Sequence, residues 1–523
     1  MRHITLILTS ILFILLPSTI KAQDKDMRWG DQGNGYYANP VLNADYSDPD
    51  VIRVGDKYYM TCSEFHYMGM NILESDDMVN WHFLSRVYDS IPLPGYSEMK
   101  RYAEGTWAPS LRYHHGVFYI FVCTPKDGLF MTCSKSAAGP WSPLLCVKSV
   151  SGWEDPCPLW DEDGQAYLGH SVYGAGPIIV HKMSPDGKRL LDEGVTVYQG
   201  PVTEGTKFLK RDGYYYLSIP EGGVGQGWQT VLRSRSIYGP YKGKRVLEQG
   251  STNINGPHQG ALVDTPTGEW WFYHFQETRS LGRVLHLEPV VWRDGFPFIG
   301  KDNDGNGIGE PMKMVKKPAV KCYDKPTTPN TSDKFNTAKL GLQWQFNHNP
   351  DNTHWSLTSR KGWLEVTALS ADSLCKARNQ FTQKVIGYRG CATVKLDYSK
   401  LVDGQRAGME CIGKLYCGAG VMMVSAKPVV YIEAGEKTTI IASLNQKHQY
   451  IYIKLTLDEV THSHQFSYSI DGTNYTDCGN AFVNYNKDWK GVRVGLYSYT
   501  VDRTCKTGQA YFDDFIYHHD GPQ

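Results

Sequence analysis

The sequence predicts an all-β protein in which a five-bladed β-propeller is followed by a β-sandwich. Aromatic residues make up 13% of the 523 residues, with 34 Tyr and 52 Gly, and this composition favours short pleated strands joined by tight turns. Hairpin-like segments recur through the first 320 residues, and alternating segments fill the rest. Because one hydrophobic core rarely supports a chain of this length, we expect at least two domains.

Five hairpin-like segments, each centred on a turn glycine, follow one another at intervals of about 50 residues. They read VIRVGDKYYMT, LRYHHGVFYIFV, LWDEDGQAYLGH, FLKRDGYYYLSI and LVDTPTGEWWFYHF, with the glycines Gly55, Gly116, Gly164, Gly213 and Gly268. Several units also end alike, in ESDDMVNWHFL, SKSAAGPWSPL and SRSIYGPYKGK. Unrelated hairpins in a sandwich would also contain glycine turns, but they would not be expected to repeat both markers. The repeat therefore favours a propeller, in which each blade is a four-stranded sheet.

The C-terminal part has a different pattern. A Pro/Thr/Asn-rich stretch, YDKPTTPNTSDKF, starts at Tyr323 and has the composition of an interdomain linker. Beyond it, segments such as GWLEVTA, CATVKLDYS, PVVYIEAG and YIYIKLTLD alternate with a period of two, as strands of a β-sandwich do. We therefore expect the propeller over 35–320, a linker over 321–332 and the sandwich over 333–520.

The N-terminus predicts export. It has a basic start, an apolar stretch from Leu6 to Leu16 and a small residue, Ala22, before a polar segment, which is the pattern of a signal peptide over 1–22. We expect a periplasmic or secreted protein. No other stretch approaches the roughly 20 apolar residues of a membrane span. The 12 cysteines form no dense framework and no CxxC pair, so their pairing stays open.

The net charge argues against a polyanionic partner. Lys plus Arg and Asp plus Glu balance at 54 each. This balance removes the electrostatic reason to expect nucleic acid or an anionic membrane surface as the partner. A neutral ligand is the better expectation.

A residue with distinct chemistry precedes each turn glycine by a similar number of positions. These residues are Asp48, Trp107, Asp155, Glu204 and His258. Equivalent positions in successive blades lie around the same end of the propeller axis, so the five side chains are expected to converge on one pocket. Each carboxylate alone could be a turn residue at a strand entry, but their joint placement favours a site.

Three converging carboxylates suit the hydrolysis of a glycosidic bond. One carboxyl must be protonated to donate to the departing oxygen, while another must be ionised to activate water or attack carbon. A third carboxylate near the acid disfavours its ionisation and raises its pKa. Asp48, Asp155 and Glu204 therefore predict a glycosidase.

Six motifs carry a resemblance to a known family. They are NADYSDPDVIRVGDKYY, GTWAPSL, WEDPCPLWDEDGQAYL, TEGTKFLKRDGYYYL, NGPHQGALV and LGRVLHLEPVVWRDGFP. Together, and in this order, they resemble glycoside hydrolase family 43 in its β-xylosidase and α-L-arabinofuranosidase branch. The resemblance continues through LQWQFNHNPDNTHWSL to AYFDDFIYH, so it covers essentially the whole mature chain. It implies a five-bladed propeller, a concanavalin-like jelly roll as the sandwich, and hydrolysis with inversion.

The resemblance also implies roles for individual residues. Asp48 of SDPD matches the general base that activates water, and Glu204 of TEG matches the general acid. Asp155 of WEDP matches the residue that tunes the pKa of the acid and orients it. Arg283 matches an arginine at the sugar subsite, whose fork can bond hydroxyls or the catalytic carboxylate; a structural ion pair is its alternative.

Three further residues are expected to form the walls of the pocket. Trp107, Phe65 and His66 offer aromatic faces that suit the C–H faces of sugars, although each could instead pack in the core. His258 is assigned to the substrate pocket, and it matches a histidine on the propeller axis that lies near a bound cation, often calcium, through water. Calcium prefers oxygen ligands, so water would hold most of its coordination sphere. No organic cofactor is expected.

The resemblance implies an exo-acting enzyme that releases a terminal pentose from plant cell-wall hemicellulose, with a loop of the sandwich narrowing the pocket mouth. The segment ADYSDPDVIRVGDKYY looks more like the arabinofuranosidase group, so we predict an α-L-arabinofuranosidase. A β-D-xylosidase, or an enzyme with both activities, is the alternative. A carbohydrate-binding protein without turnover is the second alternative.

Overall fold

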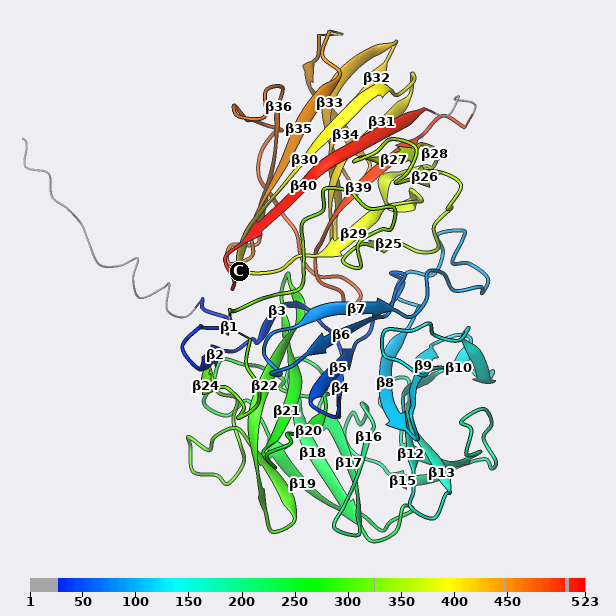
Figure 1. The fold of residues 1–523 in the computed structure, drawn as a ribbon, viewed down its shortest axis with the longest axis vertical. Helices are drawn as coiled ribbons and strands as arrows, with labels where there is room; N and C mark the ends of the chain where they lie inside the picture. The colour runs from blue at the N-terminus through cyan, green and yellow to red at the C-terminus, as the bar shows by residue number, and fades with distance from the viewer. Residues whose placement is uncertain (1–26, 324, 446, 504–507, 523) are drawn as a thin grey trace, which may run out of the picture.

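The computed structural model describes residues 27–523, except residues 324, 446, 504–507 and 523. The predicted signal peptide over 1–22 therefore lies outside the described residues. The strands form a ring of blades and a sandwich stacked on one side of it (Figure 1). Within the described ranges, the only helical segment is the 3₁₀ turn η1 (Leu374–Lys376). The predicted all-β class is confirmed.

Five sheets follow one another along the chain and form the blades. Blade 1 contains β4 (Asp50–Val54), β5 (Lys57–Thr61), β6 (Asn71–Ser75) and β7 (His82–Arg86). Blade 2 contains β8 (Trp107–His114), β9 (Val117–Thr124), β10 (Gly128–Ser134) and β11 (Leu145–Lys148). Blade 3 contains β12 (Trp153–Trp160), β13 (Ala166–Val172), β14 (Ile178–Met183) and β15 (Val195–Tyr198).

The last two blades close the ring. Blade 4 contains β16 (Lys207–Arg211), β17 (Tyr214–Glu221), β18 (Trp228–Ser234) and β19 (Lys242–Leu247). Blade 5 contains β20 (Leu262–Asp264), β21 (Trp270–Thr278), β22 (Gly282–Arg293) and β23 (Phe296–Ile299), and β3 (Leu42–Asp45) pairs with β22. A small sheet outside the ring contains β1 (Gly30–Asp31), β2 (Tyr36–Ala38) and β24 (Met314–Lys316).

The turn glycines explain why the blades repeat. Each of the five predicted glycines lies in the turn between the first and second strands of its blade, with φ between 64° and 87°. A residue with a Cβ is disfavoured in this left-handed region, so glycine permits the tight turn. First strands of neighbouring blades pack against one another, β4 on β8, β8 on β12 and β12 on β16. The residues that enter these strands therefore meet around the axis.

Two sheets form the sandwich. One sheet contains β25 (Gln345–Phe346), β29 (Phe381–Lys384), β39 (Arg493–Thr500), β31 (Gln405–Ile412), β32 (Tyr416–Val424), β33 (Lys427–Ala434) and β34 (Lys437–Ser443), with β28 (Leu369–Ser370) beside β39. The other contains β26 (Trp355–Ser356), β27 (Leu364–Thr367), β40 (Gln509–His519), β30 (Arg389–Lys400), β35 (Tyr450–Asp458), β36 (Ser463–Ser469) and β37 (Thr476–Asp477), with β38 (Phe482–Val483) beside β36. Buried and less buried residues alternate along β35, as the period-two pattern predicts.

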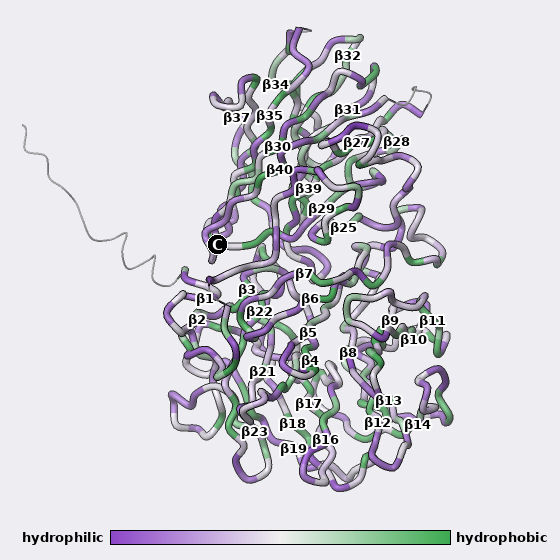
Figure 2. The backbone as a smooth tube through the Cα atoms, viewed as in Figure 1, coloured by the Kyte–Doolittle hydropathy of each residue, from purple (hydrophilic) through white to green (hydrophobic). Residues whose placement is uncertain are grey.

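A buried ionic network fixes the sandwich to blade 1. Glu64 of the propeller lies between two cations of the sandwich, with its Oε2 3.2 Å from Arg493 Nη2 and its Oε1 3.2 Å from Lys384 Nζ. Glu64 and Arg493 are each 2% exposed. One hydrophobic cluster also runs through both bodies, and Figure 2 shows hydrophobic stretches along strands of both. Separating the propeller from the sandwich would leave these buried charges unpaired. The network therefore opposes movement of one body relative to the other.

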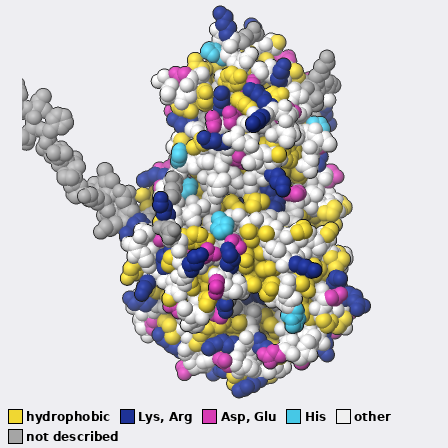
Figure 3. All heavy atoms as spheres, viewed as in Figure 1, with side chains coloured by type: hydrophobic (Ala, Val, Ile, Leu, Met, Phe, Trp, Pro, Cys, Tyr) yellow, Lys and Arg dark blue, Asp and Glu magenta, His cyan; other side chains and the backbone are white. Residues whose placement is uncertain are grey.

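The visible side of the surface has no large patch of only positive or only negative side chains (Figure 3). Lys, Arg, Asp and Glu side chains are interspersed there over both bodies (Figure 3). This distribution agrees with the balanced charge of the sequence. Among the described residues, no helix reaches the length and apolarity that crossing a bilayer requires.

Candidate active site

A pocket of about 390 Å³ lies where the first strands of the blades begin. Its lining brings together residues from the propeller and one loop of the sandwich. The lining residues are Asp48, Phe65, Trp107, Ala108, Glu154, Asp155, Tyr173, Gly174, Ala175, Val202, Glu204, Val224, Gln259, Arg283 and Trp489. The three carboxylates predicted to converge do converge.

Asp48 is held on both carboxylate oxygens. Its Oδ1 accepts a hydrogen bond from Arg283 Nη1 at 2.7 Å, and its Oδ2 accepts one from Ser63 Oγ at 2.5 Å. The φ of Asp48 is 53°, so the backbone turns sharply just before β4. The residue is 4% exposed, and its carboxylate lies beside a guanidinium that always carries its charge. These two contacts hold the Asp48 carboxyl in a fixed orientation.

Arg283 is positioned from both its backbone and its side chain. Its backbone N–H donates to Asp45 Oδ1 at 3.0 Å, and its guanidinium lies over the ring of Phe275 at 4.7 Å. The residue lies in β22 and is 7% exposed. Its ion pair with Asp48 and its place in the pocket lining agree with the predicted subsite position.

Asp155 bridges the entries of blades 3 and 4. Its Oδ2 accepts hydrogen bonds from the backbone N–H of Gly205 at 2.5 Å and from Ser171 Oγ at 3.3 Å. Burial and the nearby charge of Asp48 raise the pKa of Asp155 to about 6. Because Gly205 directly follows Glu204, Asp155 is placed both to orient Glu204 and to act on its charge.

Glu204 combines access to the pocket with a raised pKa. Its side chain is 22% exposed. Burial is the largest cause that raises its pKa to about 8, and the negative charges of Asp155 and Asp48 raise it further against the opposing effect of Arg283. Glu204 is therefore protonated at neutral pH and can donate a proton to a leaving oxygen.

Glu154 is a fourth carboxyl in the pocket, and the sequence analysis missed it. Oxygens of Glu154, Asp155 and Glu204 lie within 4.8 Å of one another. The pKa of Glu154 is raised to about 9 by burial and by the neighbouring carboxylates. Strand alternation predicts that consecutive residues point to opposite faces, but the register of β12 shifts between Glu154 and Cys157, and Asp155 has a φ of 54°. In the sequence, the only sign that Glu154 belongs to the pocket is its position next to Asp155 in WEDP.

Aromatic side chains form the walls of the pocket. Trp489, from the loop before β39, stacks on Phe65 with ring centroids 6.2 Å apart and meets Trp107 edge-on at 5.3 Å. Gly491 of this loop donates its N–H to Asp45 Oδ2 at 3.0 Å. The sandwich thus lends the propeller an aromatic wall, and Phe65 and Trp107 lie where the sequence predicts them.

Two predicted wall residues lie elsewhere. His66 does not line this pocket but a separate one between propeller and sandwich, because Phe65 has a φ of 52° and the chain reverses there. His258 is fully buried behind Glu204, with its Nε2 3.8 Å from Glu204 Oε1. Burial lowers the pKa of His258 to about 3. The structure therefore does not place the predicted wall residue His66 or the predicted pocket residue His258 in the lining of this pocket.

The imidazole of His258 could accept a cation or a water molecule as a partner. Its Nε2 is buried and has no hydrogen-bond partner within the described part of the chain. A neutral imidazole can hold a cation directly or bond to water in the coordination sphere of one. The predicted role of His258 beside a calcium ion is compatible with this orphaned nitrogen and stays a prediction.

Taken together, the ring of blades and the converging carboxyl groups define a carbohydrate-cleaving hydrolase. Models described as glycosyl hydrolases family 43 and as beta xylosidase C-terminal concanavalin A-like domain match residues 37–297 and 332–518. The chain belongs to glycosyl hydrolase family 43, and it is a glycosidase of that family.

Known relatives resemble the chain over most of its length. A protein of Xylanibacter ruminicola named "Putative beta-xylosidase" is 56% identical over 467 residues, which is 89% of this chain and 87% of the relative. A protein of Formosa agariphila named "Beta-xylosidase" is 37% identical over 576 residues, 97% of this chain and 94% of the relative. A crystal structure of a family 43 protein of Bacillus licheniformis aligns with a TM-score of 0.81 at 27% identity, over 92% of this chain and 99% of that one.

The electrostatics of the pocket predict the pH profile of an Asp155→Asn variant. If Glu204 is the acid, activity falls as pH rises through its pKa of about 8. The charge of Asp155 helps to raise that pKa, so its removal lowers the pKa and moves the basic limb of the kcat/KM profile to lower pH. An unmoved basic limb would show that Asp155 does not tune the acid.

Proposed function

We propose that this glycosidase is an exo-acting, inverting β-D-xylosidase that removes terminal xylose from oligosaccharides of plant xylan. The similarity to the two curated relatives carries the choice of sugar, because it extends over most of each chain and both are named for β-xyloside cleavage. The exo mode is supported by the pocket, which Trp489 and Phe65 wall on the side of the sandwich.

The pocket supports a division of roles among the carboxyl groups. Asp48, oriented by its ion pair with Arg283, takes a proton from water as the water oxygen bonds to the anomeric carbon. Glu204, with its raised pKa, gives its proton to the oxygen of the bond that breaks. Asp155 orients Glu204 and helps to keep it protonated. Arg283 also offers donors to the hydroxyl groups of the bound sugar.

Of the two sugars, α-L-arabinofuranose, which the sequence favours, has less support than xylose. It rests on one segment, ADYSDPDVIRVGDKYY, whereas the names of both relatives point to xylose. Export to the periplasm or the medium remains part of the proposal, since a polysaccharide substrate is met outside the cytoplasm. A calcium ion beside His258 also remains part of it.

Two chromogenic substrates test the proposal. We expect the mature chain to hydrolyse 4-nitrophenyl β-D-xylopyranoside with a higher kcat/KM than 4-nitrophenyl α-L-arabinofuranoside. The reverse preference would favour the arabinofuranosidase prediction. Binding of xylo-oligosaccharides without release of sugar from any of them would favour the carbohydrate-binding alternative.

A further inference from the structure

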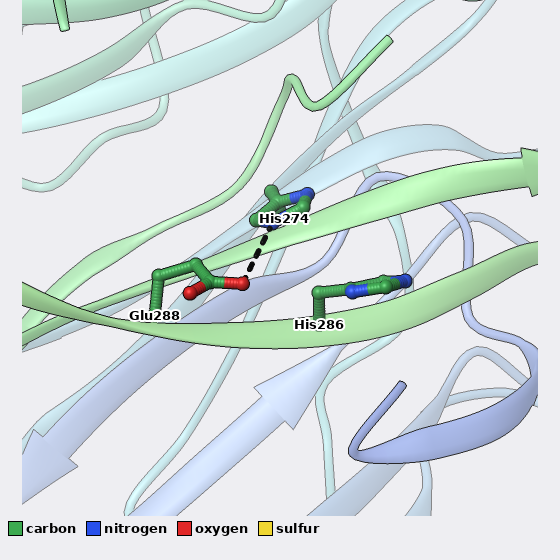
Figure 4. A group of neighbouring side chains, drawn as sticks. All are labelled: His274, His286 and Glu288. Carbon is green, nitrogen blue, oxygen red and sulfur yellow. Dashed lines mark ion pairs between the residues drawn. The ribbon is translucent and has the colours of Figure 1, made fainter. Parts of the chain in front are cut away.

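Three buried side chains of blade 5 form a second cluster outside the catalytic pocket. His274 lies in β21, and His286 and Glu288 lie in β22. They are 0%, 1% and 0% exposed. His274 is the cross-strand partner of His286, and all three side chains lie on the same side of the strand pair (Figure 4). Phe272, which stacks on His274 at 6.1 Å, packs with residues of blade 4, so the cluster lies between the two blades.

The hydrogen bonds of His274 leave a lone pair facing a carboxylate. Its Nδ1 lies 3.1 Å from the carbonyl oxygen of Phe275, which can only accept, so Nδ1 carries the proton. In the neutral ring Nε2 is then an acceptor, and it faces Glu288 Oε1 at 3.6 Å (Figure 4). That oxygen already accepts from Asn39 Nδ2 at 2.9 Å. Two acceptors face each other, and a cation between them would satisfy both.

His286 has no satisfied nitrogen. Its ring lies parallel to that of His274 at 5.0 Å, with 20° between the planes. Neither its Nδ1 nor its Nε2 has a hydrogen-bond partner among the described residues. Polar groups buried this deeply are normally paired. A proton on Glu288 would join Glu288 to His274, but it would leave His286 unpaired.

We propose that His274, His286 and Glu288 bind a structural zinc ion between blades 4 and 5. One donor atom from each residue lies within 4.8 Å of the others. Zinc bonds to imidazole nitrogen at about 2.0–2.1 Å, so small side-chain rotations bring the three donors onto one ion. Imidazole suits zinc, whereas calcium prefers oxygen. A water molecule would complete a tetrahedral sphere.

The contacts around the cluster fit a metal site of this kind. Glu288 is oriented by Asn39 Nδ2 on one oxygen and by the backbone N–H of Met312 at 3.0 Å on the other. His274 is oriented by the carbonyl of Phe275. Such outer hydrogen bonds fix the orientation of metal ligands. The three residues are absent from the lining of the catalytic pocket, so we assign the ion a structural role between the blades.

The zinc content of the purified full chain tests the proposal. The chain is produced with zinc in the medium, desalted and analysed by elemental mass spectrometry, beside His286→Leu and Glu288→Gln variants. We expect one zinc ion per chain in the parent and loss of that ion in both variants. A chelator selective for zinc over calcium is expected to lower the Tm of the parent and to leave the Tm of His286→Leu unchanged.

The His286→Leu variant separates a metal ligand from a merely buried histidine. If His286 binds nothing, replacing unpaired nitrogens with carbon leaves the Tm equal or higher. His464→Leu is the control, because His464 is also fully buried and neither of its nitrogens has a hydrogen-bond partner among the described residues, but it lies in the sandwich, where its Nδ1 is 3.8 Å from Glu459 Oε1. It should keep the zinc ion. A parent without zinc, or a His286→Leu protein that carries as much zinc as the parent, would overturn the proposal.

Discussion

An Asp48→Asn variant is expected to lose about 10²- to 10⁴-fold in kcat on every substrate, the range that general-base catalysis contributes. The amide side chain would keep an oxygen for Arg283 and fill the same volume, but it cannot accept a proton from water. The variant removes the charge that pairs with buried Arg283 but keeps an acceptor for it, so a folded protein with a lowered Tm that still binds xylose is expected. The measurement is kcat and KM on xylobiose and on an aryl xyloside.

An Asp56→Asn variant is the control for Asp48. Asp56 lies exposed in the first turn of blade 1, next to Gly55, and its replacement should leave both constants unchanged. If Asp48→Asn kept near-parental kcat while its Tm matched that of the control, Asp48 would not be the base.

A Glu204→Gln variant is expected to discriminate between leaving groups. Xylobiose has a poor leaving group that needs the proton of Glu204, so its kcat/KM should fall by about 10²- to 10⁴-fold. The 2,4-dinitrophenolate of an activated xyloside departs without needing a proton. For this substrate kcat/KM should therefore fall by less than about tenfold. The basic limb of the pH profile, set by a pKa of about 8 in the parent, should also disappear with the activated substrate.

Glu162→Gln provides the matched control for Glu204. The side chain of Glu162 is 88% exposed and pairs at the surface with Lys210, so both substrates should be cleaved at parental rates. Equal losses of Glu204→Gln on xylobiose and on the activated xyloside would contradict the acid assignment.

The fold could be predicted because its periodic features are local. Gly55 and its four counterparts are needed where the chain turns with positive φ, so the blade repeat is written at fixed positions. The alternation along β35 follows equally from one buried face. Convergence of Asp48, Asp155 and Glu204 follows from the repeat, since each enters the first strand of its blade or lies just before it.

The remaining parts of the site depend on contacts that no local pattern carries. Trp489 reaches the pocket because Gly491 bonds to Asp45, far away in sequence. Glu154 joins Asp155 in the pocket because of a register shift in β12. The left-handed backbone conformation at Phe65 directs the side chains of Phe65 and His66 into different pockets. Strand periodicity does not predict this conformation.

The anomeric configuration of the released sugar distinguishes inversion from retention. In ¹H NMR of 4-nitrophenyl β-D-xylopyranoside hydrolysis at early times, where the glycone is the only sugar released, α-xylose is expected to appear first, because water directed by Asp48 attacks opposite the departing oxygen. Slow mutarotation then forms the β-anomer. First appearance of β-xylose would contradict the account, since it would require a carboxylate of the pocket to act as a nucleophile instead of a base.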